Sequence, residues 1–170
     1  VLRVAGDARV YIPFTIFAED CRTNGKTIEI EFATRDILNY DATIISSWSG
    51  DRGIKITAQK ATIKSAMSEI STQFKEDETV RVSFAINKSS DHRLLTIYIN
   101  GIMSGIVQYA SGDDFSQVPA VGISIGSNDC TTDIYCIRVY DSELSNYQIL
   151  DNWIADTQDL TTMHDRYKRN

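Results

Sequence analysis

Positive charge, long apolar runs and proline are all scarce in this sequence of 170 residues. It has 17 Lys and Arg against 23 Asp and Glu, a net charge of −6 and a pI of about 4.9. Nucleic-acid phosphates and anionic membranes require clustered Lys and Arg, so we expect neither as a partner. No apolar run approaches the roughly 20 residues that cross a bilayer, and the chain does not open on a secretory signal. Because it begins with Val1, we interpret it as part of a longer protein.

Cysteine and histidine are too few and too scattered for the usual metal or catalytic sites. Cys21, Cys130 and Cys136 are odd in number and lack CxxC spacing, which argues against a disulfide framework and a zinc site. We expect buried free thiols, with a Cys130–Cys136 bridge as the alternative. His92 and His164 stand in polar surroundings, so we expect both to be exposed rather than part of a triad.

Short alternating apolar runs separated by Gly, Asn, Asp and Ser clusters predict strands along most of the chain. With 42% hydrophobic residues, the chain can bury one core. We therefore expect one all-β domain of two sheets. The predicted strands are Ala8 to Phe14, Thr27 to Thr34, Ala42 to Trp48, Gly53 to Ala58, Thr62 to Ser65, Ile70 to Phe74, Thr79 to Asn87, Arg93 to Asn100, Ile102 to Tyr109, Val121 to Ile125 and Thr132 to Tyr140.

The stretch "IYINGIMSGIVQY" carries the strongest turn signal. Asn100 and Gly101 both tolerate positive φ, so the pair between alternating apolar residues predicts a hairpin with Ile99 opposite Ile102. Counting outward sets Ile97 against Ser104. One face then carries Leu95, Ile97, Ile99, Ile102 and Ile106.

A capping box at Ser145-Asn146-Tyr147-Gln148 predicts a helix that runs to about Ala155. The remainder, 157–170, is polar, and we interpret it as an extension that follows a domain of residues 1–156. The stripe expected to face a sheet consists of Tyr147, Leu150 and Ile154, with Ile149 and Trp153 beside it as packing residues.

The order of these elements resembles laminin-G-like domains of the concanavalin-A-like superfamily. The resemblance rests on the hairpin "YINGIMSG", the strand end "IG" and the run "IYCIRVYDSELSNYQI", and it covers nearly the whole chain. It implies an all-β, concanavalin-A-like jelly-roll sandwich of two antiparallel sheets with a short C-terminal helix.

A narrower similarity concerns the segments "TIEIEFATRDILNYDATIIS", "ISTQFKEDETVRVSFAINK" and "DNWIADTQDLTTMHDRYKRN". They look like laminin-G-like segments of phage minor structural (tail-associated) proteins and of surface proteins of gut Firmicutes. This similarity implies a module of a virion tail or an extracellular cell surface that acts in host recognition, with neighbouring modules of the same polypeptide as partners.

The same superfamily contains laminarinase-like glycoside hydrolases, whose active strand resembles Glu-x-Asp-x-x-Glu. In "IEIEF", Glu29 and Glu31 share a face, but the middle residue of the pattern is Glu and the third position falls on Thr34. Hydrolysis needs two carboxyl groups about the scissile bond. We therefore expect no enzyme, and we interpret Glu29 and Glu31 as solvated on an outer face.

Lectins of this superfamily bind sugars with loop aromatics and amide or carboxylate groups. A pyranose stacks its apolar face on an aromatic ring and pairs its hydroxyls with polar groups. Trp48 is the first candidate for such a ring, and a Trp packed over the sandwich edge is the alternative. The full set of candidate ligand-binding residues is Tyr40, Trp48, Asp51, Arg52, Tyr109 and Phe115.

Calcium is the one cofactor that the loops suggest. Asp113, Asp114 and Asp129 stand in two Asp-rich loops, and carboxylates with loop carbonyls are calcium ligands. No EF-hand spacing is present, so solvated turn carboxylates are the alternative.

These observations favour a non-catalytic, lectin-like module for a cell-surface glycan or polysaccharide. The principal alternative is an architectural or protein-interaction module of a virion structural protein with no sugar ligand. A glycoside hydrolase is third, because this sandwich hosts all three classes.

Overall fold

The computed structural model describes residues 1–13, 24–50, 52–75, 79–87, 94–109 and 122–167, with side chains of the last segment described through 157. The described strands form two six-stranded antiparallel sheets. Strands of the first sheet, sheet A, are β1 (Leu2–Val4), β12 (Thr131–Tyr140), β3 (Lys26–Arg35), β8 (Val80–Ile86), β9 (Leu94–Ile99) and β10 (Ile102–Gln108), in that spatial order. Strands of the second, sheet B, are β2 (Val10–Ile12), β11 (Ile123–Ile125), β4 (Thr43–Ser49), β5 (Arg52–Thr57), β6 (Lys60–Lys64) and β7 (Glu69–Gln73).

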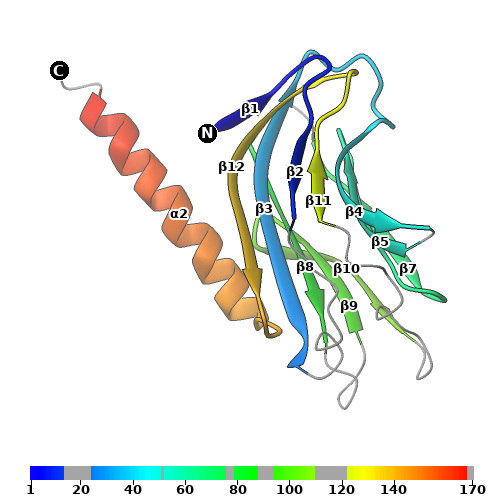
Figure 1. Cartoon of the computed structure of the whole chain (residues 1–170). Coiled ribbons are helices and arrows are strands. Elements are labelled where there is room, and N and C mark those ends of the chain that lie inside the picture. Colours follow the sequence, from blue (N-terminus) through cyan, green and yellow to red (C-terminus); the bar gives the residue numbers. More distant parts are fainter. Residues whose placement is uncertain (14–23, 51, 76–78, 88–93, 110–121, 168–170) are drawn as a thin grey trace.

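The two sheets pack face to face as a β-sandwich, and helix α2 (Asn146–Tyr167) lies on the outer side of sheet A (Figure 1). This arrangement confirms the predicted jelly-roll sandwich with a C-terminal helix. All eleven predicted strands are present with small shifts at their ends. The three-residue strand β1 was not predicted, and its pairing with β12 includes the ion pair of Arg3 Nε with Asp133 Oδ1 at 2.6 Å.

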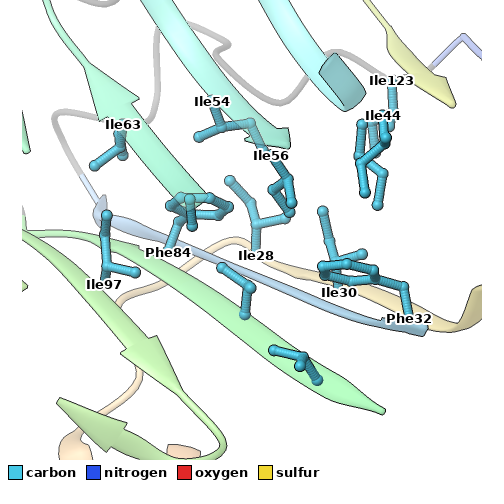
Figure 2. Packing of buried hydrophobic residues seen from close by; sticks show 14 of the residues in the cluster. Ile28, Ile30, Phe32, Ile44, Ile54, Ile56, Ile63, Phe84, Ile97 and Ile123 are labelled. Carbon is cyan, nitrogen blue, oxygen red and sulfur yellow. The ribbon is translucent and has the colours of Figure 1, made fainter. Parts of the chain in front are cut away.

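The core between the sheets is rich in β-branched residues, which suit a pleated surface packed on one face. Figure 2 shows side chains of sheet B meeting those of sheet A in this layer. Phe32 and Phe74 add an edge-to-face aromatic contact with ring centroids 5.8 Å apart. The buried members labelled there are Ile28, Ile30, Phe32, Ile44, Ile54, Ile56, Ile63, Phe84, Ile97 and Ile123.

The β9–β10 hairpin confirms the predicted turn and corrects the predicted register. Ile99 pairs with Ile102, and Asn100 and Gly101 have φ of 52° and 78°. Beyond Met103 a β-bulge at Ser104 shifts the register, so Gly105, not Ser104, pairs with Ile97. A bulge inserts one residue and moves the following side chains to the other face. Ile106 therefore pairs with Thr96 instead of Leu95, and its predicted place on the same face as Leu95 and Ile97 was wrong. Ile102 still pairs with Ile99 as predicted, although its side chain is exposed.

Helix α2 begins at the predicted capping box, in which the backbone N–H of Ser145 donates to Gln148 Oε1 at 2.9 Å and the N–H of Gln148 donates to Ser145 Oγ at 3.3 Å. The helix continues to Tyr167, well past Ala155 and across the predicted boundary between 156 and 157. The side of the helix that packs on sheet A differs by one residue position from the predicted apolar stripe of Tyr147, Leu150 and Ile154. Ile149 is fully buried, whereas Tyr147 and Ile154 are exposed.

Trp153 acts in packing, as expected. The turn residue Gly101 lies so close to the helix that an added Cβ would be 3.2 Å from Trp153 Cβ and 3.1 Å from Leu150 Cδ1. Cys130 and Cys136 are free thiols, as predicted, but only Cys130 is buried and Cys136 is half-buried. Cys21 and His92 lie outside the described residues, and so does the side chain of His164.

Candidate functional site

The outer face of sheet B carries Trp48 near the end of β4. The half-buried indole is held at two points: its Nε1 donates to the carbonyl oxygen of Gly50 at 3.1 Å, and Lys55 Nζ lies 4.9 Å from the ring centroid. A cation above an aromatic face is attracted by the ring quadrupole. Trp48 is thus neither a core residue nor a free loop side chain, but a ring fixed on the sheet surface.

Trp48 stands beside a row of polar residues that crosses all six strands of sheet B. Directly paired residues of an antiparallel sheet point to the same face. Ser46, two residues before Trp48, shares its face. Register pairs between neighbouring strands form the row Tyr11, Ser124, Ser46, Lys55, Thr62 and Ser71. We call these six residues with Trp48 the sheet B face.

Two contacts order the ends of the sheet B face. Thr62 Oγ1 and Ser71 Oγ are 2.8 Å apart in a hydrogen bond. At the other end, the exposed Tyr11 accepts a hydrogen bond on its hydroxyl from the backbone N–H of Gly122 at 3.1 Å. The face therefore offers aromatic rings, hydroxyl groups that both donate and accept, and one ammonium group.

The structure separates several of the predicted ligand-binding residues. Tyr40 is exposed but lies before β4, whereas Trp48 lies near the C-terminal end of that strand. A strand rises about 3.3 Å per residue, so most of the length of β4 separates the two side chains. Arg52 pairs with Ser49 and lies next to Trp48 in the register. Asp51 and Phe115 lie outside the described residues.

Tyr109 does not belong to a surface site. It is 2% exposed, packs in the core, and donates its hydroxyl hydrogen to the carbonyl oxygen of Asn87 at 2.7 Å. Its position directly after β10 had suggested a loop, but the bulge at Ser104 changes which side chains of this strand turn inward.

Of the three residues predicted to bind calcium, the structure describes only Asp129. Asp113 and Asp114 lie outside the described residues. Asp129 occupies the β11–β12 turn, where its backbone N–H donates to Ser127 Oγ at 3.1 Å and its carbonyl accepts from the N–H of Leu38 at 2.6 Å. Within the described part of the chain, no three His, Cys, Asp or Glu residues are grouped to hold a metal ion.

Glu29 and Glu31 are on the outer face of sheet A, but the expectation that they are solvated was wrong. Both are buried, because helix α2 covers this face. Glu29 Oε2 accepts from Tyr140 Oη at 3.1 Å and from Asn152 Nδ2 at 3.3 Å. Glu31 Oε2 accepts from Arg81 Nε at 3.0 Å. These contacts give both carboxylates a structural role.

The two glutamates belong to a larger group that we call the charge cluster: Glu29, Glu31, Arg81, Arg138, Tyr140, Asn152 and Asp156. Asp156 of α2 lies between two guanidinium groups, with Oδ2 at 2.5 Å from Arg81 Nη2 and 2.6 Å from Arg138 Nη1. The hydrogen bond from Arg138, aided by Arg81 and opposed by burial, lowers the pKa of Asp156. The same bond raises the pKa of Arg138. The helix is therefore anchored to sheet A by ionised groups.

Burial and the neighbouring carboxylate of Glu29 raise the pKa of Tyr140. Its phenol accordingly keeps its proton at neutral pH and donates a hydrogen bond to Glu29.

Sequence reasoning missed the charge cluster and most of the sheet B face. The alternation of Ser46 and Trp48 in "TIISSWS" was the one local signal available, because the other members join only through strand register.

Comparison with known proteins bears on the fold. No protein-family model and no curated protein matches the chain. Among solved structures, the botulinum neurotoxin serotype D binding domain matches with a TM-score of 0.67 at 14% identity, over 91% of this chain and 42% of that one. The binding domain of botulinum neurotoxin DC in complex with SialylT matches with a TM-score of 0.62 at 16% identity, over 91% and 42%. The serotype G binding domain gives 0.59 at 13%, over 91% and 46%.

This chain thus spans less than half the length of those chains. Likeness at these identities defines the class of fold, a two-sheet β-sandwich, and nothing narrower. In the described residues, no helix is long and apolar enough to cross a membrane.

Proposed function

We propose that the chain is a non-catalytic carbohydrate-binding module that takes its glycan on the sheet B face at Trp48. The observation that carries the proposal is the fixed indole of Trp48 beside an unbroken row of hydroxyl side chains and Lys55. A pyranose needs an apolar surface for its ring and paired donors and acceptors for its hydroxyls. The likeness to neurotoxin binding domains, one of them solved with SialylT, supports this choice.

In this proposal, Lys55 has two roles. Without ligand, its ammonium group holds the indole by the cation–π contact. With ligand, its flexible four-carbon stem lets the ammonium group swing off the ring and donate to a sugar hydroxyl. Ser46, which pairs with Lys55, supplies a further hydroxyl group, whereas Thr62 on the other side of Lys55 is buried and orders Ser71 by a hydrogen bond.

In this proposal the module is part of a larger phage tail-associated or bacterial surface protein of laminin-G-like type. The sequence resemblance alone supports this placement. The catalytic alternative is disfavoured because Glu29 and Glu31 are buried and bound within the charge cluster.

A protein-interaction module is the second candidate function, and one observation favours it. The edge strand β10 exposes Ile102, Met103 and Ile106. Apolar side chains exposed together are typical of surfaces that contact another protein. A neighbouring module of the same polypeptide is the partner that this candidate implies.

A glycan array probed with the whole chain, with and without calcium, tests the proposal. Trp48→Ala should lower affinity at least about tenfold, or about 1.4 kcal/mol, because it removes the stacking surface. Tyr147→Ala is the matched control, since Tyr147 is an exposed aromatic residue on helix α2. Circular dichroism checks that both variants fold.

The result that would overturn the proposal is array silence, or glycan binding that Trp48→Ala leaves unchanged. Silence combined with loss of self-association or partner binding in Ile106→Ser would favour the interaction module. If binding requires calcium, Asp129→Asn tests the predicted metal residue that the structure describes.

A further inference from the structure

The ring of Tyr11 reaches from strand β2 onto the start of strand β11. These two strands and β4 are neighbours at one end of sheet B (Figure 1). The hydroxyl of Tyr11 accepts from the backbone N–H of Gly122 at 3.1 Å, and an added Cβ on Gly122 would be 2.8 Å from Tyr11 Cζ. The absence of a side chain at Gly122 therefore lets the tyrosine ring lie directly against the backbone there.

The strand register brings this ring close to Trp48. Ser124 of β11 pairs with Tyr11 on one side and with Ser46 on the other. Continuing the antiparallel register by two residues places Gly122 opposite Trp48. Neighbouring strands are about 4.8 Å apart, so the hydroxyl end of Tyr11 lies about one strand spacing from the backbone of Trp48. The two aromatic rings are therefore neighbours on the sheet B face.

Both rings are held in place by the protein itself. Trp48 donates to the carbonyl oxygen of Gly50 and has Lys55 over its ring. Tyr11 is fixed by Gly122 on one side, while 58% of its surface is exposed. A side chain that is already ordered loses little conformational entropy when a ligand binds. Each ring can therefore serve as a platform for a sugar.

The size of the two-ring surface exceeds that of one sugar. A pyranose presents one apolar face to one aromatic ring, so a single sugar occupies a single platform. Ser46 and the exposed Ser124 lie beside the rings and add hydroxyl groups that donate and accept hydrogen bonds. Two platforms with hydroxyl groups beside them suit a chain of linked sugars better than a single sugar.

We propose that the sheet B face binds two or more residues of one glycan chain, with one sugar stacked on Trp48 and another on Tyr11. The glycan chain then runs across strands β4, β11 and β2 rather than along them. This inference rests on the function proposed at Trp48 and names its ligand class, an oligosaccharide or polysaccharide chain in place of a single terminal sugar.

Isothermal titration calorimetry of the whole chain with sugars of increasing length tests the proposal. The probes are D-glucose to cellotetraose, N-acetyl-D-glucosamine to chitotetraose, and the strongest ligand of the glycan array with its stepwise shortened forms. In the series that binds, affinity should rise about threefold to tenfold once the sugar is long enough to reach Tyr11, because a second stacked ring is gained.

Four variants show which ring causes the rise. Tyr11→Ala should lower the affinity for long sugars about threefold to tenfold and that for single sugars much less. Tyr11→Phe keeps the ring and should retain most of the rise. Trp48→Ala should lower affinity at every length. The matched control Tyr147→Ala removes an exposed tyrosine from helix α2 and should change affinity at no length.

The proposal is overturned if affinity does not depend on the length of the sugar. It is equally overturned if Tyr11→Ala lowers affinity for single and long sugars by the same factor. Either result leaves the function proposed at Trp48 intact as long as Trp48→Ala still weakens binding. If no sugar of any length binds, both proposals fail.

Discussion

Replacing Asp156 with asparagine tests whether charge anchors helix α2 to sheet A. The substitution keeps the size of the side chain and removes its negative charge between Arg81 and Arg138. Arg81 is almost fully buried, so the loss of a partner carboxylate leaves part of its charge uncompensated. The folded state should therefore lose stability although no apolar contact changes.

The magnitude follows from the geometry. A hydrogen bond to a charged group contributes about 1.5 to 3 kcal/mol, and breaking a fully buried ion pair costs about 3 to 5 kcal/mol. Asp156 is 30% exposed, Arg81 keeps Glu31, and asparagine keeps one acceptor oxygen. We therefore expect a loss of about 2 kcal/mol, equivalent to a decrease in Tm of about 4 to 8 °C at this chain length.

Urea denaturation followed by circular dichroism measures the free energy of unfolding. The matched control is Asp151→Asn, an exposed position on the same helix, which should change the free energy by less than about 0.5 kcal/mol. A double-mutant cycle with Arg138→Met should give a coupling energy of about 1 kcal/mol. If Asp156→Asn costs no more than Asp151→Asn, or the coupling is zero, the anchoring argument is refuted.

The pH dependence gives an independent check. The pKa of Asp156 is lowered in the folded state, first by the hydrogen bond from Arg138. The stabilisation is therefore complete above the unfolded pKa of about 3.9 and is lost as pH falls through the folded value. The difference between the wild-type chain and Asp156→Asn should be largest near neutral pH and should shrink below about pH 4.

Three further substitutions test the fold by the same urea assay. Gly101→Ala should lower the free energy of unfolding by about 1 to 2 kcal/mol, because φ is 78° and the new Cβ would be 3.1 Å from a side chain of helix α2. The control Gly6→Ala has a similar φ but open space around the new Cβ, so it should lower the free energy of unfolding by less. Phe84→Ala should cost about 3 to 5 kcal/mol as a fully buried core residue, whereas the exposed Ile102→Ala should cost under about 0.5 kcal/mol. Ser145→Ala should cost about 1 kcal/mol by loss of the helix cap. Equal effects within either pair, or no effect at the cap, would contradict these assignments.

Local chemistry in the sequence determined the strands, the Asn100-Gly101 turn and the start of the helix. Positive φ at a two-residue turn favours Asn and Gly, and a Ser with Gln three residues later satisfies the first helical N–H groups. Such features depend on neighbours in the chain and can be recognised without the fold. They were enough to predict the two-sheet β-sandwich with its C-terminal helix.

The sequence also determined that Trp48 is the leading aromatic candidate for a ligand, because it closes a polar, alternating strand. It could not determine what surrounds that ring. Tyr11, Lys55 and Ser71 reach the sheet B face only through the register of separate strands, which depends on pairing across the whole sheet.

Only the tertiary structure decided whether the charged residues on the outer face of sheet A are buried or solvated. Glu29 and Glu31 alternate with apolar neighbours, a pattern equally suited to a solvated face and to a face covered by a helix. Helix α2 covers them because Arg81, Arg138 and Asp156 neutralise one another across the contact. Burial of charge requires partners, and these partners come from elements far apart in the chain, so no local pattern could reveal them.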